Sequence, residues 1–510
     1  MATLYNLLVI IAVSIGSFTY GFTFGTPSNI IGYPSFTSYF NVDLSGPNPG
    51  YASSMQGAIV GVFFAGGFFG SFGFAWLADK LGRLRALQIV CVVILVSVVI
   101  SAAAVNIAML LVGRILSGIG GGGLNVIPPM FQSEISVAHQ RGRNVGFHGV
   151  FFVAGLDTVA WIAVGCYFIS SANTSWRLLL GLQAVSPAVL LAISFLLPES
   201  PRWLLLNGRE EQAFETLCRL HDGKNDTEHR LAHEELVAIK TQIELDAQHD
   251  TSYTGLFRRP STRRRLLTGI FLMFAQQSTG QNVLFGFQVN VLATLGLTEW
   301  KPLLVSGFYV LVAVIGNIGG GMIMDSFGRR KLLLVGMIGA CLACAIHTGL
   351  LVQYSGTDNK VGAGAAVAFL FLFISFFGPG VDVTSYVYAA EIFPTYMRAR
   401  GVSMTIATYF AFAALYVCVS QTAVAGIGYK FNIVFVALTA VNTVVIYYTF
   451  PETKGQSLEA IGKLFGDAAV SDDVGEATIG DMEKRIDGKG MLEKKETAND
   501  KTQVSVAMVQ

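Results

Sequence analysis

Twelve apolar runs of about 20 residues each limit how this chain can fold more than any other feature. Each run is long enough to cross the roughly 30 Å hydrocarbon core of a bilayer. Because that core offers no water to backbone polar groups, such spans must be helical. The runs lie at about 5–25, 56–76, 87–106, 109–131, 144–169, 176–197, 265–288, 302–324, 331–352, 363–388, 400–420 and 428–450. The sequence therefore predicts an all-α membrane protein.

Lys and Arg are distributed unequally between the loops on the two sides of these spans. Residues 26–55 contain neither, whereas the opposite side carries DKLGRLR (79–85), RRPSTRRR (258–265) and DSFGRRK (325–331). Basic loops mark the cytosolic side of a membrane protein. We therefore expect both termini in the cytosol, together with linker helices in 198–264. The polar tail, 451–510, is expected to be cytosolic and disordered after about 465.

The two halves of the chain repeat one pattern of charges. An Asp-x-x-Gly-Arg motif begins at Asp79 after span two and again at Asp325 after span eight. A Glu precedes an Arg by seven residues after span four and again after span ten. A direct repeat of six spans is typical of transporters whose substrate site lies between the halves. The sequence thus predicts two six-helix bundles, 1–197 and 265–450.

The repeated charges form two sets at the cytosolic helix ends. We expect them to pair while the outer side is open and to break when the carrier turns inward, so that they act as a latch. The alternative is solvated loop charge, since exposed pairs are worth about 0–1 kcal/mol. These gate residues are Asp79, Arg83, Glu134, Arg141, Glu199 and Arg202 in the first half and Asp325, Arg329, Glu391, Arg398 and Glu452 in the second.

Seven motifs occur in an order and at spacings that together are specific. They are GRILSGIGGGG (113–123), PMFQSEISVAHQRG (129–142), PESPRWLLLNGR (198–209), QQSTGQN (276–282), DSFGRR (325–330), EIFPTYMRARG (391–401) and PETKGQSLEAI (451–461). From about residue 5 to 465 the chain resembles the sugar porter family of the major facilitator superfamily, in a subgroup similar to fungal members. The resemblance implies alternating-access transport of a hexose, pentose or similar polyol across the plasma membrane.

Three amides of span seven are the main candidates for substrate contact: Gln276, Gln277 and Asn282. Neutral amides both donate and accept, which suits an uncharged ligand rich in hydroxyl groups. The resemblance gives span seven the main sugar contacts. The alternative role for these amides is hydrogen bonding between helices.

The resemblance also implies changes in the remaining walls of the site. Tyr386 stands where many sugar porters have a Trp in span ten, and either ring can stack on a sugar. His148 stands where a Gln is expected in span five, and Ala313 where an Asn is expected in span eight. We include Tyr386 and His148 among the substrate-binding candidates.

Energy coupling depends on acids within the spans. The resemblance places an Asp in span one of proton-coupled members, paired with an Arg of span four; here Thr23 and Arg114 hold these places. The absence of the span-one acid favours a facilitator, which carries its substrate down a gradient. The competing hypothesis is that Asp157 or Asp382 serves as the proton-coupling acid instead. Asp157 is expected to face the central cavity, as a ligand contact or as counter-charge to Arg114. A protonated Asp157 bonded to a backbone carbonyl is the alternative.

Other functions have little support in the sequence. It has no metal-ligand cluster, nucleophile elbow or nucleotide motif, so we expect no enzyme, no cofactor, no metal and no nucleic acid partner. The expected partners are a small-molecule substrate, the lipid bilayer and, if transport is coupled, protons, with the chain monomeric. Asn173 begins an outer glycosylation sequon. Two alternatives stay open: a carrier of a carboxylated ring compound or secreted natural product, and a sensor that binds but does not transport.

Overall fold

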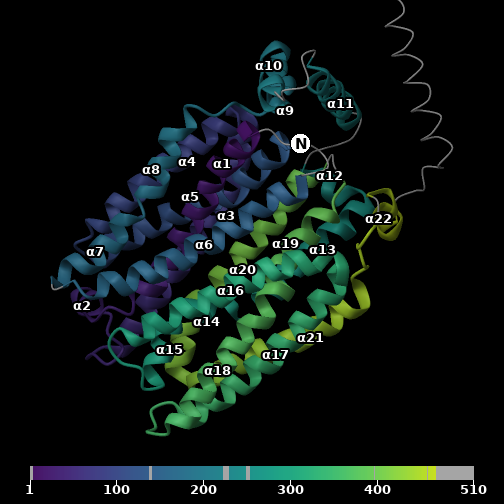
Figure 1. Cartoon of the computed structure of the whole chain (residues 1–510). Helices are drawn as coiled ribbons and strands as arrows, with labels where there is room; N and C mark the ends of the chain where they lie inside the picture. Colours follow the sequence, from purple (N-terminus) through teal and green to yellow (C-terminus); the bar gives the residue numbers. More distant parts are fainter. Residues whose placement is uncertain are drawn as a thin grey trace, which may run out of the picture. The chain divides into compact units, whose positions relative to one another are not determined.

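Helices make up the fold (Figure 1), and the structure, a computed structural model, describes residues 4–136, 141–169, 171–221, 229–247, 253–394, 397–456 and 458–466. The first half contains α1 (Leu4–Ile30), α2 (Pro34–Tyr39), α3 (Pro49–Leu81), α4 (Arg83–Ala102), α5 (Ile107–Ile135), α6 (Arg141–Tyr167), α7 (Ala172–Leu182) and α8 (Val185–Ser194). The linker contains α9 (Pro201–Leu206), α10 (Glu210–His221), α11 (Arg230–Ala247) and α12 (Tyr253–Arg258).

The second half contains α13 (Pro260–Gln277), α14 (Gln281–Gly286), α15 (Gln288–Thr294), α16 (Lys301–Phe327), α17 (Arg329–Tyr354), α18 (Lys360–Phe377), a π-helix (Gly378–Asp382), α19 (Val383–Glu391), α20 (Arg398–Ile427), a 3₁₀ turn (Gly428–Phe431) and α21 (Asn432–Thr449). A second compact unit begins at Gln456 and contains α22 (Leu458–Phe465).

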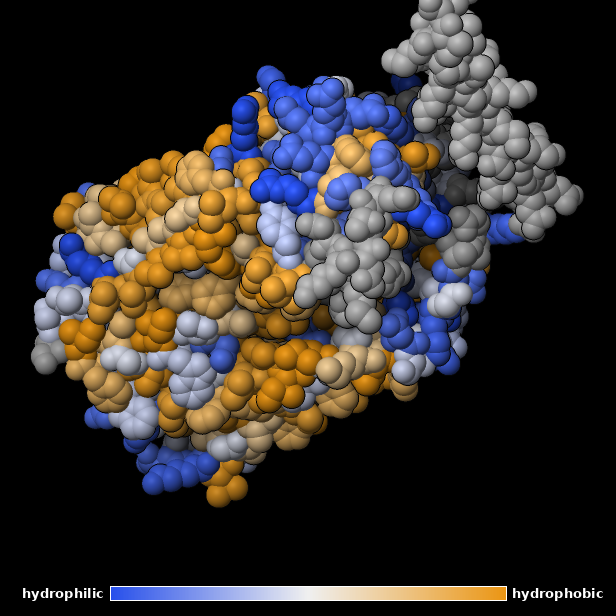
Figure 2. Space-filling view, turned by 45° about the horizontal axis from the view of Figure 1, so that its top comes forward, coloured by the Kyte–Doolittle hydropathy of each residue, from blue (hydrophilic) through white to orange (hydrophobic). Residues whose placement is uncertain are grey.

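The helices account for the expected spans. In the part of the chain that is described, 10 stretches are long and apolar enough to cross a membrane, and the last of these, Arg400–Thr449, contains both α20 and α21. Span seven is absent from those stretches because it is broken into α13, α14 and α15. Hydrophobic residues cover the middle of the face in Figure 2, with hydrophilic residues toward its ends. The prediction of an all-α, twelve-span membrane protein is confirmed.

The Gly-rich stretch of span four lets α5 and α3 approach closely. A Cβ on Gly118 would lie 2.0 Å from the carbonyl oxygen of Phe63, and one on Gly122 would lie 2.4 Å from the carbonyl oxygen of Gly67. Both distances are shorter than any van der Waals contact, so a larger residue would separate the helices. These glycines therefore serve helix packing, as small residues commonly do in membranes.

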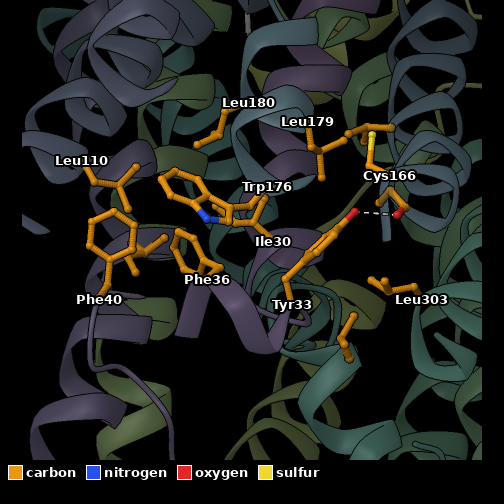
Figure 3. Packing of buried hydrophobic residues seen from close by; sticks show 14 of the residues in the cluster. Ile30, Tyr33, Phe36, Phe40, Leu110, Cys166, Trp176, Leu179, Leu180 and Leu303 are labelled. Atoms are coloured by element: carbon orange, nitrogen blue, oxygen red, sulfur yellow. Dashed lines mark hydrogen bonds between the residues drawn. The ribbon is translucent and has the colours of Figure 1, made fainter. Parts of the chain in front are cut away.

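One end of the molecule is closed by a buried aromatic cluster (Figure 3). Trp176 of α7 is fully buried and packs edge-on against Phe36 of α2, with ring centroids 5.6 Å apart. Tyr33 donates to the main-chain carbonyl of Ala163 in α6 at 2.5 Å. Leu303 of α16 belongs to the same cluster, so the second half of the chain packs here against the first.

The linker helices pack against the opposite ends of the spans, as α9 does on α5 and α10 does on α1. The buried residues of α10 are Ala213, Thr216, Leu217 and Leu220, which share one face of a helix. Trp203 of α9 donates its indole N–H to the carbonyl of Asp79 at 2.9 Å. The end of the molecule that carries Asp79 and Trp203 is called the basic end below.

Candidate substrate site between the two halves

A break in span seven positions the expected amides. Helix α13 ends at Gln277, and α14 starts after Gly280, whose φ of 79° lies in the left-handed region. Only glycine adopts that conformation without strain. A Cβ on Gly280 would also lie 2.7 Å from the ring of Phe435, so the space excludes a side chain. Discontinuous helices of this kind form substrate sites in many transporters.

The three amides meet the rest of the second half through short hydrogen bonds. Gln276 donates to Asp382 at 3.2 Å. Asn282 donates to Gln277 Oε1 at 2.7 Å and to the hydroxyl of Tyr409 in α20 at 3.3 Å. All three amides are buried, so each of these bonds is shielded from water. The structure thus brings together the residues that the sequence singled out in span seven.

Asp382 connects span seven to span eight. It is the last residue of the π-helix between α18 and α19, and such bulges are frequent at functional sites. Its second oxygen accepts from Asn317 of α16 at 3.1 Å. Asn317 was not among the predicted residues, because the resemblance placed the expected Asn at Ala313, one helical turn earlier. The signal was available, since Asn317 is a polar residue within an apolar, glycine-rich span.

Aromatic rings of the first half face this polar cluster. Tyr20 of α1 stacks on Phe152 of α6, with centroids 4.9 Å apart. Phe24, one turn further, stacks on Phe285 of α14 with centroids 5.6 Å apart, which joins the two halves. Polar groups therefore dominate the side formed by the second half, and aromatic rings dominate the side formed by the first.

Tyr386 lies at the boundary between these two sides. Its ring is 6.4 Å from that of Tyr409, and its side chain lies next to Asn125 of α5. His148 of α6 is hydrogen-bonded to Ser17 of α1 at 2.8 Å, within the first half. The structure therefore places Tyr386 beside the polar cluster, whereas the described contact of His148 ties it to α1.

Arg114 has neutral partners. It donates to the main-chain carbonyls of Thr23 and Ile59, both at 3.3 Å, and its guanidinium lies 4.9 Å from the ring centroid of Phe63. Thr23 is the residue that occupies the place of the expected acid in span one. Its backbone carbonyl, rather than a side-chain carboxylate, receives the arginine.

Asp157 and Arg114 have other described partners, so the expected counter-charge pairing does not form in this structure, and the expected position of Asp157 at the central cavity stays a prediction. Asp157 instead accepts from the indole N–H of Trp161, one turn along α6, at 3.1 Å. The Trp161 ring packs edge-on against Phe308 of α16, with centroids 5.2 Å apart. Asp157 is partly buried at this contact between α6 and α16. The described hydrogen bond of Asp157 is therefore a local one, to an aromatic N–H group of the same helix.

The gate residues of the first half form a compact cluster at the basic end. Arg83 donates twice to Glu134, at 2.8 and 2.9 Å, and lies 3.3 Å from Asp79. Glu199 accepts from the main-chain N–H of Arg83 at 3.0 Å. Burial raises the pKa of Glu199, while its bonds to main-chain N–H groups, among them that of Ser200, oppose the rise.

The second half repeats this arrangement residue by residue. Arg329 donates to Glu391 at 2.9 Å and lies 2.7 Å from Asp325. Glu452 accepts from the main-chain N–H of Arg329 at 2.9 Å. Thr453 donates to Glu391 at 2.7 Å, as Ser200 does to Glu134 at 2.6 Å. The repeat read from the sequence is therefore also a repeat of contacts.

Three gate residues remain: Arg202, Arg398 and Arg141. Arg202 and Arg398 make further interactions, whereas the side chain of Arg141 lies outside the described residues. Asn173, the glycosylation candidate, is exposed at the start of α7.

Helices α3 and α20, and helices α6 and α16, make the most extensive contacts between the halves, and two hydrogen bonds between the halves lie at the end opposite the charge clusters. Asn290 of α15 donates to Gln56 of α3 at 2.7 Å, and Ser54 is 3.5 Å from Thr422 of α20. The ion pairs described above, in contrast, each join elements of one half. The expectation that these pairs break when the carrier turns inward, and so act as a latch, stays a prediction.

Two repeated helical bundles, with amides at a broken helix between them, define a membrane carrier of the major facilitator type. The chain belongs to the family described as "Sugar (and other) transporter", whose model matches residues 9–465. Among solved structures it is similar to the xylose transporter XylE from E. coli, in a partially occluded inward-open conformation. The TM-score is 0.75 with 20% sequence identity, covering 89% of this chain and 100% of that one.

Several curated relatives share most of their length with this chain. The MFS-type transporter criB of Aspergillus cristatus is 31% identical over 460 residues, which cover 90% of this chain and 92% of the relative. The high-affinity glucose transporter of Kluyveromyces lactis is 29% identical, with coverages of 91% and 86%. The quinate permease of Neurospora africana is also 29% identical, with coverages of 90% and 89%.

Proposed function

We propose that this protein carries a neutral sugar or similar polyol across the membrane by alternating access between its two halves. The observation that carries the proposal is the cluster of buried amides at the break in span seven, where Gln276, Gln277 and Asn282 lie between the halves. Such amides both donate and accept, so they bind hydroxyl groups without themselves adding a charge to the site. A relative's description as a glucose transporter supports the same substrate class.

Transport by this carrier is facilitative. Arg114 donates to the carbonyls of Thr23 and Ile59, and Thr23, which holds the place of the span-one acid, cannot accept a proton near neutral pH. A carrier that lacks a proton acceptor there runs down the gradient of its substrate. Asp382 is the acid that would serve a proton-coupled cycle, because it lies within the polar cluster.

The basic end faces the cytosol. Its Lys- and Arg-rich loops support this orientation, with both termini on the cytosolic side of the plasma membrane. Asn173 then lies outside the cell, where its exposed position makes it accessible for glycosylation. The carrier functions as a monomer.

The aromatic side of the site favours a second candidate substrate, a hydroxylated ring compound larger than a sugar. Tyr20, Phe24 and Phe152 offer flat apolar surface to such a ring. Relatives described as a quinate permease and as an MFS-type transporter support a family that takes more than hexoses.

Uptake of labelled compounds into a transporter-deficient host tests these proposals together. The panel contains D-glucose, D-xylose, D-galactose, myo-inositol and quinate, each with and without a protonophore. We expect saturable uptake of a sugar that persists with the protonophore. Uptake of quinate alone would favour the second candidate, and binding without uptake would identify a sensor. Loss of accumulation with the protonophore would show proton coupling.

A further inference from the structure

Two buried amides share one carboxylate within the polar cluster. Gln276 Nε2 donates to Asp382 Oδ1, and Asn317 Nδ2 donates to Asp382 Oδ2. The three residues come from α13, α16 and the π-helix, so the carboxylate links three separate elements. Because an ionised carboxylate can only accept hydrogen bonds, each amide must turn its NH₂ group toward it.

This orientation leaves both amide carbonyls without a partner. Gln276 Oε1 and Asn317 Oδ1 are buried, and within the described part of the chain neither accepts a hydrogen bond. Buried polar atoms in proteins nearly always have a partner, so each exception needs an explanation. Gln276 is 2% exposed and Asn317 is 8% exposed, so both side chains are shielded from bulk water. Both carbonyl oxygens are therefore hydrogen-bond acceptors that have no donor in the described part of the chain.

Gln277 has the opposite orientation. Its Oε1 accepts from Asn282 at 2.7 Å, so Nε2 is the group left to bind a ligand, and Nε2 can only donate. The adjacent residues Gln276 and Gln277 therefore present opposite hydrogen-bond polarity, although their side chains are chemically identical. The difference comes from their neighbours, Asp382 for one and Asn282 for the other.

We propose that Asp382 is a positioning residue that fixes Gln276 and Asn317 as acceptors, so that the substrate must present a hydrogen-bond donor to each carbonyl. The inference rests on the proposed function and narrows its substrate class. A neutral polyol supplies such donors through two hydroxyl groups as the site opens to admit it. A ligand carboxylate supplies only acceptors and would stand near the charge of Asp382. The arrangement selects polyols against carboxylated rings.

Transport of fluorinated sugars tests the proposal, because fluorine replaces a hydroxyl at similar size but cannot donate. The probes are D-glucose and its monodeoxyfluoro analogues, with fluorine at each hydroxyl in turn, measured as competitors of labelled D-glucose. Two positions of fluorine should weaken binding by about tenfold to a hundredfold, since each leaves a buried carbonyl unpaired. Equal binding of every analogue would overturn the proposal while leaving the carrier function intact.

Asp382→Asn then separates positioning from simple packing. An amide at this position offers an NH₂ group, so one of the two partner amides can reverse and present a donor. The fluorine penalty at one position should fall to about threefold or less, while the other persists. Asp43→Asn is the matched control, because it neutralises an acid that accepts from the main-chain N–H of Ser45, outside the polar cluster. Its fluorine pattern should equal that of the wild type.

Asn317→Ala covers the case in which Asp382→Asn does not reach the membrane. This variant keeps the carboxylate and removes one acceptor, so one fluorine-sensitive position should lose its penalty. Unchanged penalties at both positions would overturn the role of Asn317 and with it the proposal. If the wild type takes up neither D-glucose nor any other compound of the panel, the proposed function itself is rejected.

Discussion

The guanidinium of Arg114 donates to the backbone carbonyl of Thr23 at 3.3 Å, across the contact between α5 and α1. The position of Thr23 is the one at which proton-coupled sugar porters are expected to carry an acid. A side-chain carboxylate at this place would lie close to a cation whose described partners are two carbonyls and an aromatic ring, and whose Nη2 has no hydrogen-bond partner in the described part of the chain. Substitutions at Thr23 and Arg114 therefore test whether a buried acid in span one requires the buried cation of span four.

Thr23→Asp should be tolerated because Arg114 is already in place to receive the new charge. The double variant Thr23→Asp/Arg114→Leu should fail, since an unpaired acid at this depth costs about 2.5–3.5 kcal/mol on insertion scales. Surface expression and melting temperature in detergent measure how well each of these two variants is tolerated. Arg114→Leu alone is the control for loss of the cation. Equal expression of the single aspartate variant and the double variant would contradict the assigned pairing.

Replacing each span-seven amide by alanine should weaken substrate binding. Gln276→Ala, Gln277→Ala and Asn282→Ala each remove one hydrogen-bonding partner from a buried site, at a cost of about 1–3 kcal/mol in affinity. That cost corresponds to a rise in KM of about fivefold to a hundredfold. Kinetics of uptake at matched surface expression measure it.

Gln132→Ala is the matched control for these variants. Gln132 is a fully buried amide of α5 that donates to Ser14 of α1 at 2.8 Å, away from the span-seven break. Its loss should lower stability and leave KM within about twofold of the wild type. Unaltered KM in all three span-seven variants would reject these amides as substrate contacts.

The two carboxylates that contact Arg83 should differ widely in importance. The Glu134 side chain is 10% exposed and pairs with an arginine side chain that is 6% exposed, so Glu134→Gln leaves a buried cation and costs about 3–5 kcal/mol of stability. The Asp79 side chain is 61% exposed, and Asp79→Asn should cost at most about 1 kcal/mol. Thermal unfolding of the purified protein compares them. Similar melting temperatures of the two variants would show that burial does not determine how much each ion pair of Arg83 contributes to stability.

The sequence predicted the fold and the members of both charge clusters because these depend on patterns along the chain. Apolar length defines a span, and the Asp-x-x-Gly-Arg repeat marks equivalent helix ends in the two halves. Arg83–Glu134 and Arg329–Glu391 both form as that repeat implies. Each pair lies within one half, as the two sets in the sequence indicated. What the pattern cannot show is whether these pairs break during transport, because that depends on how the two halves move.

The polar site was predicted only in part. Gln276, Gln277 and Asn282 stand out because amides are costly in an apolar span. The link from Gln276 through Asp382 to Asn317 depends on the π-helix, whose extra residue changes which side chains of span ten face α16. The partner of Asp157 was missed for a different reason. Trp161 lies one turn away on the same helix, and an indole N–H group was not among the partners expected for Asp157.

Gly280→Ala should abolish transport, because the break between α13 and α14 requires this glycine. Alanine would be strained at a φ of 79°, and its Cβ would lie 2.7 Å from the ring of Phe435. Gly296→Ala is the matched control, since its φ of 86° is similar but no atom lies within 4 Å of the added Cβ. In this control, only backbone strain should lower the free energy of unfolding, by about 1–2 kcal/mol. Adding Phe435→Leu to Gly280→Ala removes the clash and should restore part of the uptake. If Gly280→Ala and Gly296→Ala transport equally well, contact with Phe435 does not position the span-seven amides.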